Sequence, residues 1–136
     1  MIDLQETKRI KQLLEENPNE FKSIIEDTAL AICITDEKGN YSAVNENYEL
    51  LYGYAKGELH GKSFLLVVPE DRKDLLDRTH NTFLKNKNEI LRNWEVKKKD
   101  GKVFKIWADA GFNDKINGKP HKITFVQPVD KEDALN

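Results

Sequence analysis

The apolar residues between positions 4 and 25 recur at the spacing of one helix face. They form two groups, Ile10, Leu13 and Leu14 and then Phe21, Ile24 and Ile25. Pro18 separates the groups, because it disfavours helical backbone at the residue before it, and Asn19 can cap the second helix. The pattern therefore predicts two short helices here rather than one long helix.

From residue 30 the spacing changes to the alternation of a β-strand. Ile32 and Ile34 share one face of this strand, whereas Cys33 lies on the other face. Turn-forming residues at 36–40 and a returning strand at 41–45 complete a predicted hairpin.

A helical region comes after the hairpin. Asn45 can cap a short helix that reaches Tyr52, and glycines break residues 53–61 into turns. Pro69 opens a longer predicted helix that continues to about Lys87. One apolar stripe of this helix consists of Leu75, Leu76, Thr79 and Phe83.

The last third of the chain is predicted to be strand. Segments 91–99, 103–112 and 122–127 alternate, and Asp-Gly and Asn-Gly turns join them. Two strands, short helices and then three strands predict an α+β fold, in which helices pack on an antiparallel sheet.

Trp107 lies on the strand face opposite Ile106 and Ala108, and an indole exposed there would leave a large apolar area in water. The N-terminal helices or a dimer contact can cover it. We therefore expect an interface, for a helical cap or a homodimer, made of Leu13, Phe21, Ile24, Ile25 and Trp107.

Composition restricts the possible functions. Hydrophobic residues make up 38% and charged residues 34% of the 136 residues, which fits one small cored domain. The net charge is −2, whereas nucleic-acid binding usually needs a basic excess. No apolar run reaches the roughly 20 residues that span a bilayer, and the charged N-terminus lacks a secretory signal. We expect a cytoplasmic protein without a membrane segment, and the single Cys33 agrees with this.

Several short motifs occur in a characteristic order. They are ICITD at 32–36, VN at 44–45, YGY at 52–54, ELHGK at 58–62, PEDR at 69–72 and KKDG at 98–101. In this order and spacing, segment 21–130 resembles the PAS sensor family of bacterial signal-transduction proteins. The resemblance implies a five-stranded antiparallel sheet, with short helices and one longer helix cupping one face. Residues 1–20 would then be an N-terminal helical cap or dimerisation helix, and 131–136 a C-terminal tail.

The resemblance also implies a pocket between the sheet and the long helix, which holds haem, flavin, a small metabolite or nothing. The expected lining consists of Ile32, Ile34, Ala43, Tyr48, Leu51, Leu76, Thr79, Phe83, Trp94, Ile106, Ala108, Phe125 and Gln127. An ordinary core would contain the same residues. A small-ligand sensor and a ligand-free dimerisation or docking module are therefore both open.

The cofactor alternatives have little support. Light-sensing relatives carry a reactive Cys where this chain has residues 61–65, which contain none, although Gln127 matches their flavin-contacting Gln. Leu76 occupies the position of the haem ligand in haem-binding relatives, and His80 lies one turn further along. His60 and His121 fall in turns and are expected to be solvated. No metal-binding or catalytic motif is present, so no enzyme is predicted.

Two further expectations come from the family. Glu58 is expected to form a salt bridge with Lys99, and the motif that leads into an output helix is altered at 128–130. The chain would then be excised from a longer sensor kinase, or would act by binding a partner protein or kinase.

Overall fold

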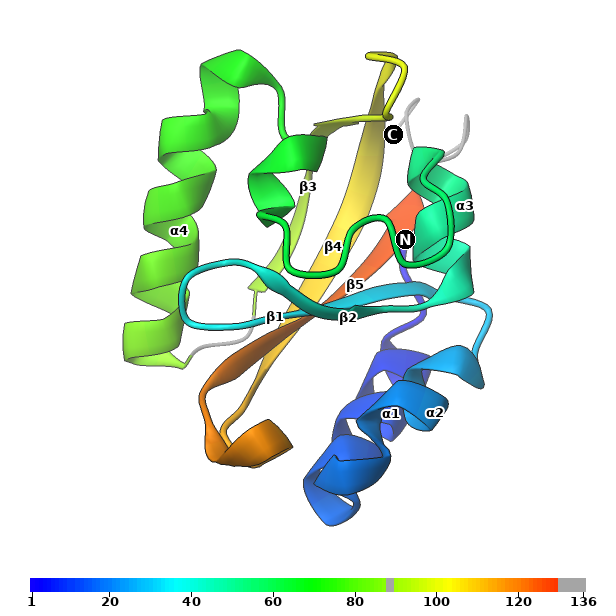
Figure 1. Ribbon diagram of the computed structural model, residues 1–136, viewed down its shortest axis with the longest axis vertical. Helices are drawn as coiled ribbons and strands as arrows, with labels where there is room; N and C mark the ends of the chain where they lie inside the picture. The colour runs from blue at the N-terminus through cyan, green and yellow to red at the C-terminus, as the bar shows by residue number, and fades with distance from the viewer. Residues whose placement is uncertain (88–89, 130–136) are drawn as a thin grey trace.

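The computed structural model describes residues 1–87 and 90–129 (Figure 1). Its helices are α1 (Leu4–Glu16), α2 (Phe21–Glu26), α3 (Glu46–Tyr52) and α4 (Lys73–Asn86). Its strands are β1 (Ala31–Thr35), β2 (Tyr41–Val44), β3 (Ile90–Lys97), β4 (Val103–Asn113) and β5 (His121–Pro128). The predicted tail at 131–136 lies outside the described residues.

The strands form a single sheet in the order β2-β1-β5-β4-β3, in which every neighbouring pair is antiparallel. The first and last strands of the chain therefore meet at the centre of the sheet. The α+β prediction, with a five-stranded antiparallel sheet, is confirmed.

The N-terminal segment folds as two helices, as predicted. Asp3 caps α1, because its side chain accepts hydrogen bonds from the backbone N–H groups of Gln5 and Glu6. A short 3-10 turn at Pro18–Glu20 separates α1 from α2. None of the described helices is long and apolar enough to cross a bilayer.

Asn45 caps α3 as predicted, and it also ties three segments together. Its Oδ1 accepts hydrogen bonds from Tyr48 N and Ile32 N, at 3.0 and 2.9 Å. Its Nδ2 donates to Ile25 O and Leu30 O, at 2.7 and 2.8 Å. One buried amide therefore fixes the end of α2, the start of β1 and the start of α3 relative to one another.

The two faces of the sheet carry separate apolar clusters. The outer cluster, beneath α1 and α2, consists of Ile2, Ile10, Leu14, Phe21, Ile25, Leu30, Ile32, Ile34, Ile116, Ile123 and Phe125. The inner cluster, beneath α3 and the loops after it, consists of Ala31, Cys33, Tyr41, Tyr48, Tyr52, Leu59, Val67, Val96, Ile106, Ala108 and Val126. Because helices cover both faces, all five residues of β1 are buried.

The long helix differs from the prediction in its start and in its buried face. Pro69 precedes a 3-10 turn at Glu70–Arg72, and α4 begins only at Lys73. Leu75 is 47% exposed, while His80 is buried together with Leu76 and Phe83. The buried face of α4 is therefore turned away from Leu75, relative to the predicted stripe, and includes His80.

Candidate functional site

A cavity lies on the inner face of the sheet, between the strands, α4 and the 3-10 helix Phe64–Val67. Its volume is about 40 Å³. A single water needs roughly 10–15 Å³ on this scale, so the cavity has space for a few non-hydrogen atoms. Its lining consists of Cys33, Thr35, Tyr48, Tyr52, Phe64, Val67, Val68, Leu76, His80, Trp94, Val96, Ile106, Lys122, Thr124 and Val126.

His80 brings a buried imidazole to this cavity. The residue is 1% exposed, and its ring lies 5.3 Å from that of Phe64, between centroids. Its Nε2 donates a hydrogen bond to Asp36 O at 3.0 Å, since a carbonyl can only accept. Burial lowers the pKa of His80, and the charge of Lys122 lowers it further. The ring is therefore neutral at pH 7, and its Nδ1 carries a lone pair.

Lys122 is the second buried basic group in the lining. It lies on β5, is 6% exposed, and places its Nζ 5.1 Å from the centroid of the Phe83 ring. Burial lowers the pKa of Lys122 to about 8. Among the described residues, no carboxylate lies within salt-bridge distance of this Nζ, which leaves a buried charge supported mainly by an aromatic ring.

Phenol and thiol groups form the end of the cavity near α3. The Tyr41 and Tyr48 hydroxyls are 2.7 Å apart, and the Tyr48 and Tyr52 rings pack with centroids 4.6 Å apart. Burial raises the pKa of the Cys33 thiol to about 11, so the thiol is protonated and unreactive at neutral pH. Cys33 packs in the inner cluster.

The structure brings only part of the predicted lining together. Four predicted residues line the cavity: Tyr48, Leu76, Trp94 and Ile106. Leu51 and Ala108 belong to the inner cluster without reaching the cavity. Phe83 is buried on α4 beside Lys122 but is not part of the lining, and Thr79 donates its hydroxyl hydrogen to Leu75 O within the helix.

The remaining predicted residues lie on the other face, and their placement in the pocket is wrong. Ile32, Ile34 and Phe125 belong to the outer cluster, and Ala43 packs against it. Gln127 borders a separate surface depression beside Leu30 and Leu50. The alternation correctly separated Ile32 from Cys33, but both faces are apolar, so alternation alone could not say which one faces the cavity.

Two buried residues were missed for different reasons. Lys122 was missed because a lysine at the start of a strand normally indicates solvent. His121 was expected in a solvated turn, but it is 2% exposed, and its Nε2 lies 3.2 Å from Ser42 Oγ. The prediction was wrong because β5 begins at His121, so this residue pairs with the sheet. His60 is exposed, as expected.

Haem and flavin do not fit the cavity as it is built. Pockets for drug-sized ligands measure about 300–1,000 Å³, many times the present volume of about 40 Å³. The His80 Nε2 is already engaged by Asp36 O, and Gln127 does not line the cavity. Within the described residues there is also no group of three or more His, Cys, Asp and Glu side chains placed to hold a metal.

The predicted salt bridge between Glu58 and Lys99 is confirmed, with Oε2 and Nζ 2.6 Å apart. Lys99 N also donates to Tyr52 O at 2.9 Å. The turn between β3 and β4 is therefore fastened to the C-terminal end of α3, next to the inner cluster.

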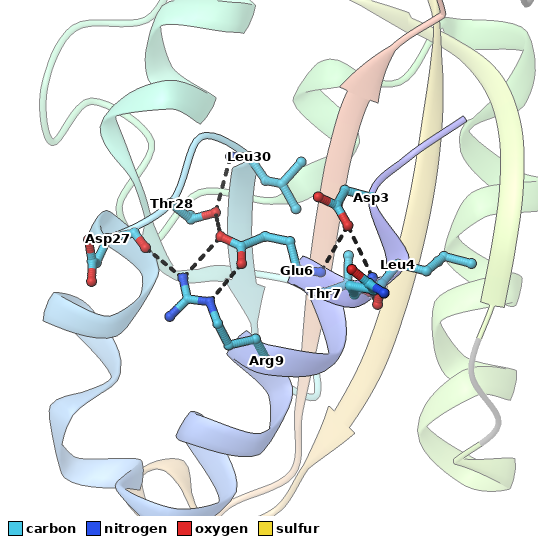
Figure 2. A network of polar contacts seen from close by, with 9 residues as sticks. Asp3, Leu4, Glu6, Thr7, Arg9, Asp27, Thr28 and Leu30 are labelled. Carbon is cyan, nitrogen blue, oxygen red and sulfur yellow. Dashed lines mark hydrogen bonds and ion pairs between the residues drawn. The ribbon is translucent and has the colours of Figure 1, made fainter.

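A polar network holds α1 against the loop after α2 (Figure 2). Arg9 donates to both carboxylate oxygens of Glu6, at 2.6 and 3.0 Å, and to Asp27 O at 2.9 Å. Thr28 donates its hydroxyl hydrogen to Glu6 at 2.6 Å and accepts from Leu30 N at 3.3 Å. The network thus links α1 to the residue just before β1.

The residues predicted for an interface lie mainly inside the N-terminal cap. Phe21 and Ile25 are buried in the outer cluster, and Ile24 and Trp107 pack against it half-buried. Leu13 is half-buried on α1. Trp107 is therefore half-buried against the cluster that contains α1 and α2 residues, and pairing with a second copy remains a prediction.

Known proteins with similar sequences and folds agree on one family. The family model described as the PAS fold matches residues 19–111. The sensor protein TdiS of Thauera aromatica is 27% identical over 110 residues, which cover 80% of this chain and 20% of that protein. This chain therefore spans about a fifth of that relative's length.

Solved structures show the same fold at low sequence identity. The PAS domain of a Desulfitobacterium hafniense protein is 18% identical with a TM-score of 0.70, and the match covers 79% of this chain and 99% of that one. A Rhodobacter sphaeroides LOV protein is 10% identical with a TM-score of 0.69, and the match covers 96% of this chain and 70% of that one. Because the family model matches more than half of this chain, the chain belongs to the PAS family.

Proposed function

We propose that this PAS domain is a signal-sensing module that binds a small molecule in the cavity between the sheet and α4. The observation that carries the proposal is the cavity itself, because the Nδ1 of His80 is buried there without a hydrogen-bond partner among the described residues. Lys122, which is 6% exposed, also lines the cavity and forms no ion pair with a described carboxylate. A core that only stabilised the fold would be expected to satisfy or exclude such groups. The sensor protein TdiS among the relatives supports a role in signalling.

A route for the signal leads through the central strands to the N-terminal helices. Lys122 faces the cavity, while its neighbour Ile123 packs in the outer cluster with Ile10 of α1. A ligand that changes the position of β5 therefore acts on both faces of the sheet. For α1 to transmit this change, it must have two positions that ligand binding populates differently.

The module would signal without catalysis, through a partner protein, an attached kinase or a second copy of itself. A cytoplasmic location fits this role. The partners, the absence of catalysis and the location remain predictions from the sequence. The homodimer can be tested by light scattering of the unaltered chain and of Ile24→Asp. If a dimer forms and Ile24→Asp stays dimeric, the interface is not on the N-terminal helices.

Mass spectrometry of small molecules released from the denatured, purified protein tests ligand binding. We expect a co-purifying compound, or a thermal shift with members of a metabolite library. Val67→Phe fills the cavity from the 3-10 helix and should abolish either signal, whereas the exposed control Leu66→Phe should retain it. The absence of any bound or stabilising compound would overturn the sensing proposal and leave the docking module as the function.

A further inference from the structure

The charge of Lys122 needs an acceptor that the described part of the chain does not supply. Burying an unpaired ammonium costs several kcal/mol even after relaxation. Its described neighbours in the cavity lining are hydroxyl groups, the Cys33 thiol, apolar side chains, Trp94 and His80, none of them a carboxylate, and the Phe83 ring offsets only part of this cost. An anion would therefore satisfy Lys122.

His80 presents the opposite requirement. Its Nε2–H is fixed by Asp36 O, so the neutral ring can only accept at Nδ1. This Nδ1 is buried and has no hydrogen-bond partner among the described residues. A hydrogen-bond donor would therefore satisfy His80.

The two requirements occur at one place in the fold. His80 and Phe83 lie one turn apart on α4, and the Phe83 ring contacts Lys122 from β5. The surrounding lining is largely apolar, with Val67, Val68 and Leu76 among its members. A guest must therefore be small, carry one anionic group and one donor, and otherwise be apolar.

We propose that the cavity binds a small hydroxycarboxylate, whose carboxylate accepts from Lys122 Nζ and whose hydroxyl donates to His80 Nδ1. The proposal rests on the sensing function proposed above and names its ligand class. A carboxylate matches a single ammonium, whereas a phosphate dianion would need further cationic donors, and no arginine is among the described residues that line the cavity. The volume of about 40 Å³ restricts the ligand to the shortest hydroxy acids.

Isothermal titration of the purified chain with glycolate, acetate and the neutral glycolamide tests this assignment. We expect glycolate to bind most tightly, acetate more weakly because it leaves Nδ1 unsatisfied, and glycolamide weakest because it lacks the charge. Lys122→Met should weaken glycolate binding roughly tenfold to hundredfold, the effect of losing a charge-assisted hydrogen bond. His80→Phe should reduce glycolate affinity to that of acetate.

Two controls keep the result interpretable. Lys119→Met removes an exposed lysine just before β5 and should leave binding unchanged. Lys122→Met should fold with at least the stability of the unaltered chain in a thermal melt, because it replaces a buried ammonium with an apolar side chain. Lost affinity then reports the contact, not unfolding.

The outcomes separate this proposal from the sensing function. If other compounds bind in a Val67-dependent manner and no carboxylate does, sensing stands and the hydroxycarboxylate assignment is overturned. If Lys122→Met binds glycolate with the same affinity as the unaltered chain, the hydroxycarboxylate assignment is also overturned. Glu89 lies outside the described residues, so Glu89→Gln is titrated as well. Unchanged affinity is expected, and tighter glycolate binding would overturn the premise that Lys122 is available to a ligand carboxylate.

Discussion

A single amide, Asn45, occupies the point where the outer and inner halves of this domain meet. Its four hydrogen bonds reach α2, β1 and α3, and the residue is 1% exposed. Helix capping alone would need only the bond to Tyr48 N. The other three bonds explain why a serine or aspartate cap would not replace Asn45, since neither can donate two hydrogens while accepting two.

Asn45→Ala should be strongly destabilising. It leaves Ile32 N and Ile25 O without their side-chain partner and leaves Leu30 O only the longer 3.4 Å bond from Asn47, and each unsatisfied buried group costs about 1–3 kcal/mol. We expect a loss of roughly 3 kcal/mol or more in urea unfolding. Asn47→Ala, which removes contacts from a half-buried side chain, is the matched control and should cost clearly less. Equal losses would contradict this account of Asn45.

Glu6 makes the N-terminal cap sensitive to acid. Hydrogen bonds from Arg9 and then from Thr28 lower the pKa of Glu6 to about 2, from an ordinary value of 4.5. A depressed pKa contributes stability that is present above the ordinary value and is lost as pH falls toward 2. Arg9 and Glu6 are partly exposed, so solvent screening keeps the contribution modest.

Glu6→Gln should therefore lower the melting temperature at pH 7 and have a shrinking effect between pH 4.5 and 2. Thermal melts of both proteins across this range measure the difference. Glu16→Gln, at the exposed end of the same helix, is the control. A difference that stays constant with pH would show that the charge of Glu6 does not hold α1 in place.

At the scale of elements, α1 is attached to the sheet by a buried ion pair. Lys11 Nζ lies 3.0 Å from Asp109 Oδ2, with side chains 16% and 4% exposed. The Lys11 stem crosses β4 at Gly111, where an added Cβ would lie 2.9 Å from Lys11 Cε. Gly111 therefore provides the space in which a lysine can lie flat against the strand.

Lys11→Met should cost about 3–5 kcal/mol in urea unfolding, because it leaves Asp109 buried without its cation. Adding Asp109→Leu should restore most of this loss, since apolar replacement of a whole buried pair is often neutral. The difference in unfolding free energy between the single and double variants reports the cost of leaving the Asp109 charge unpaired. If the double variant were as unstable as the single one, packing of the lysine stem would govern the docking of α1.

At the scale of the whole molecule, the domain has two cores separated by one sheet. The family model starts at residue 19, so α1 lies outside the matched segment although it covers the outer cluster. The outer face carries Ile32, Ile34 and Phe125, an apolar surface too large to leave in water. The N-terminal helix is thus a structural part of this domain.

Ile10→Asp should displace α1 while leaving the inner core folded. Ile10 is 0% exposed in the outer cluster, and a charge there loses its solvation. We expect increased binding of a hydrophobic dye or self-association, with the strand signal in circular dichroism retained. Gln12→Asp, exposed on the same helix, should change neither. Complete unfolding of Ile10→Asp would show instead that the two cores form one cooperative unit.

Much of the architecture could be predicted from local patterns, because helix breaks, helix caps and strand alternation each depend on residues close together in the sequence. The break at Pro18, the cap at Asn45 and the five strands follow from turn chemistry and periodicity. The salt bridge of Glu58 with Lys99 was found through family resemblance and not through spacing, since the two residues are 41 positions apart.

The sequence by itself determined which side chains share a strand face, and only the tertiary structure decided which face encloses the cavity. Alternation separates Cys33 from Ile32 and Ile34 whatever surrounds them, because it is a property of the backbone. The direction in which each face looks depends on which helices cover it, and here both faces are covered. For the same reason the burial of Lys122 and His80 came from distant elements meeting around them, which no local pattern records.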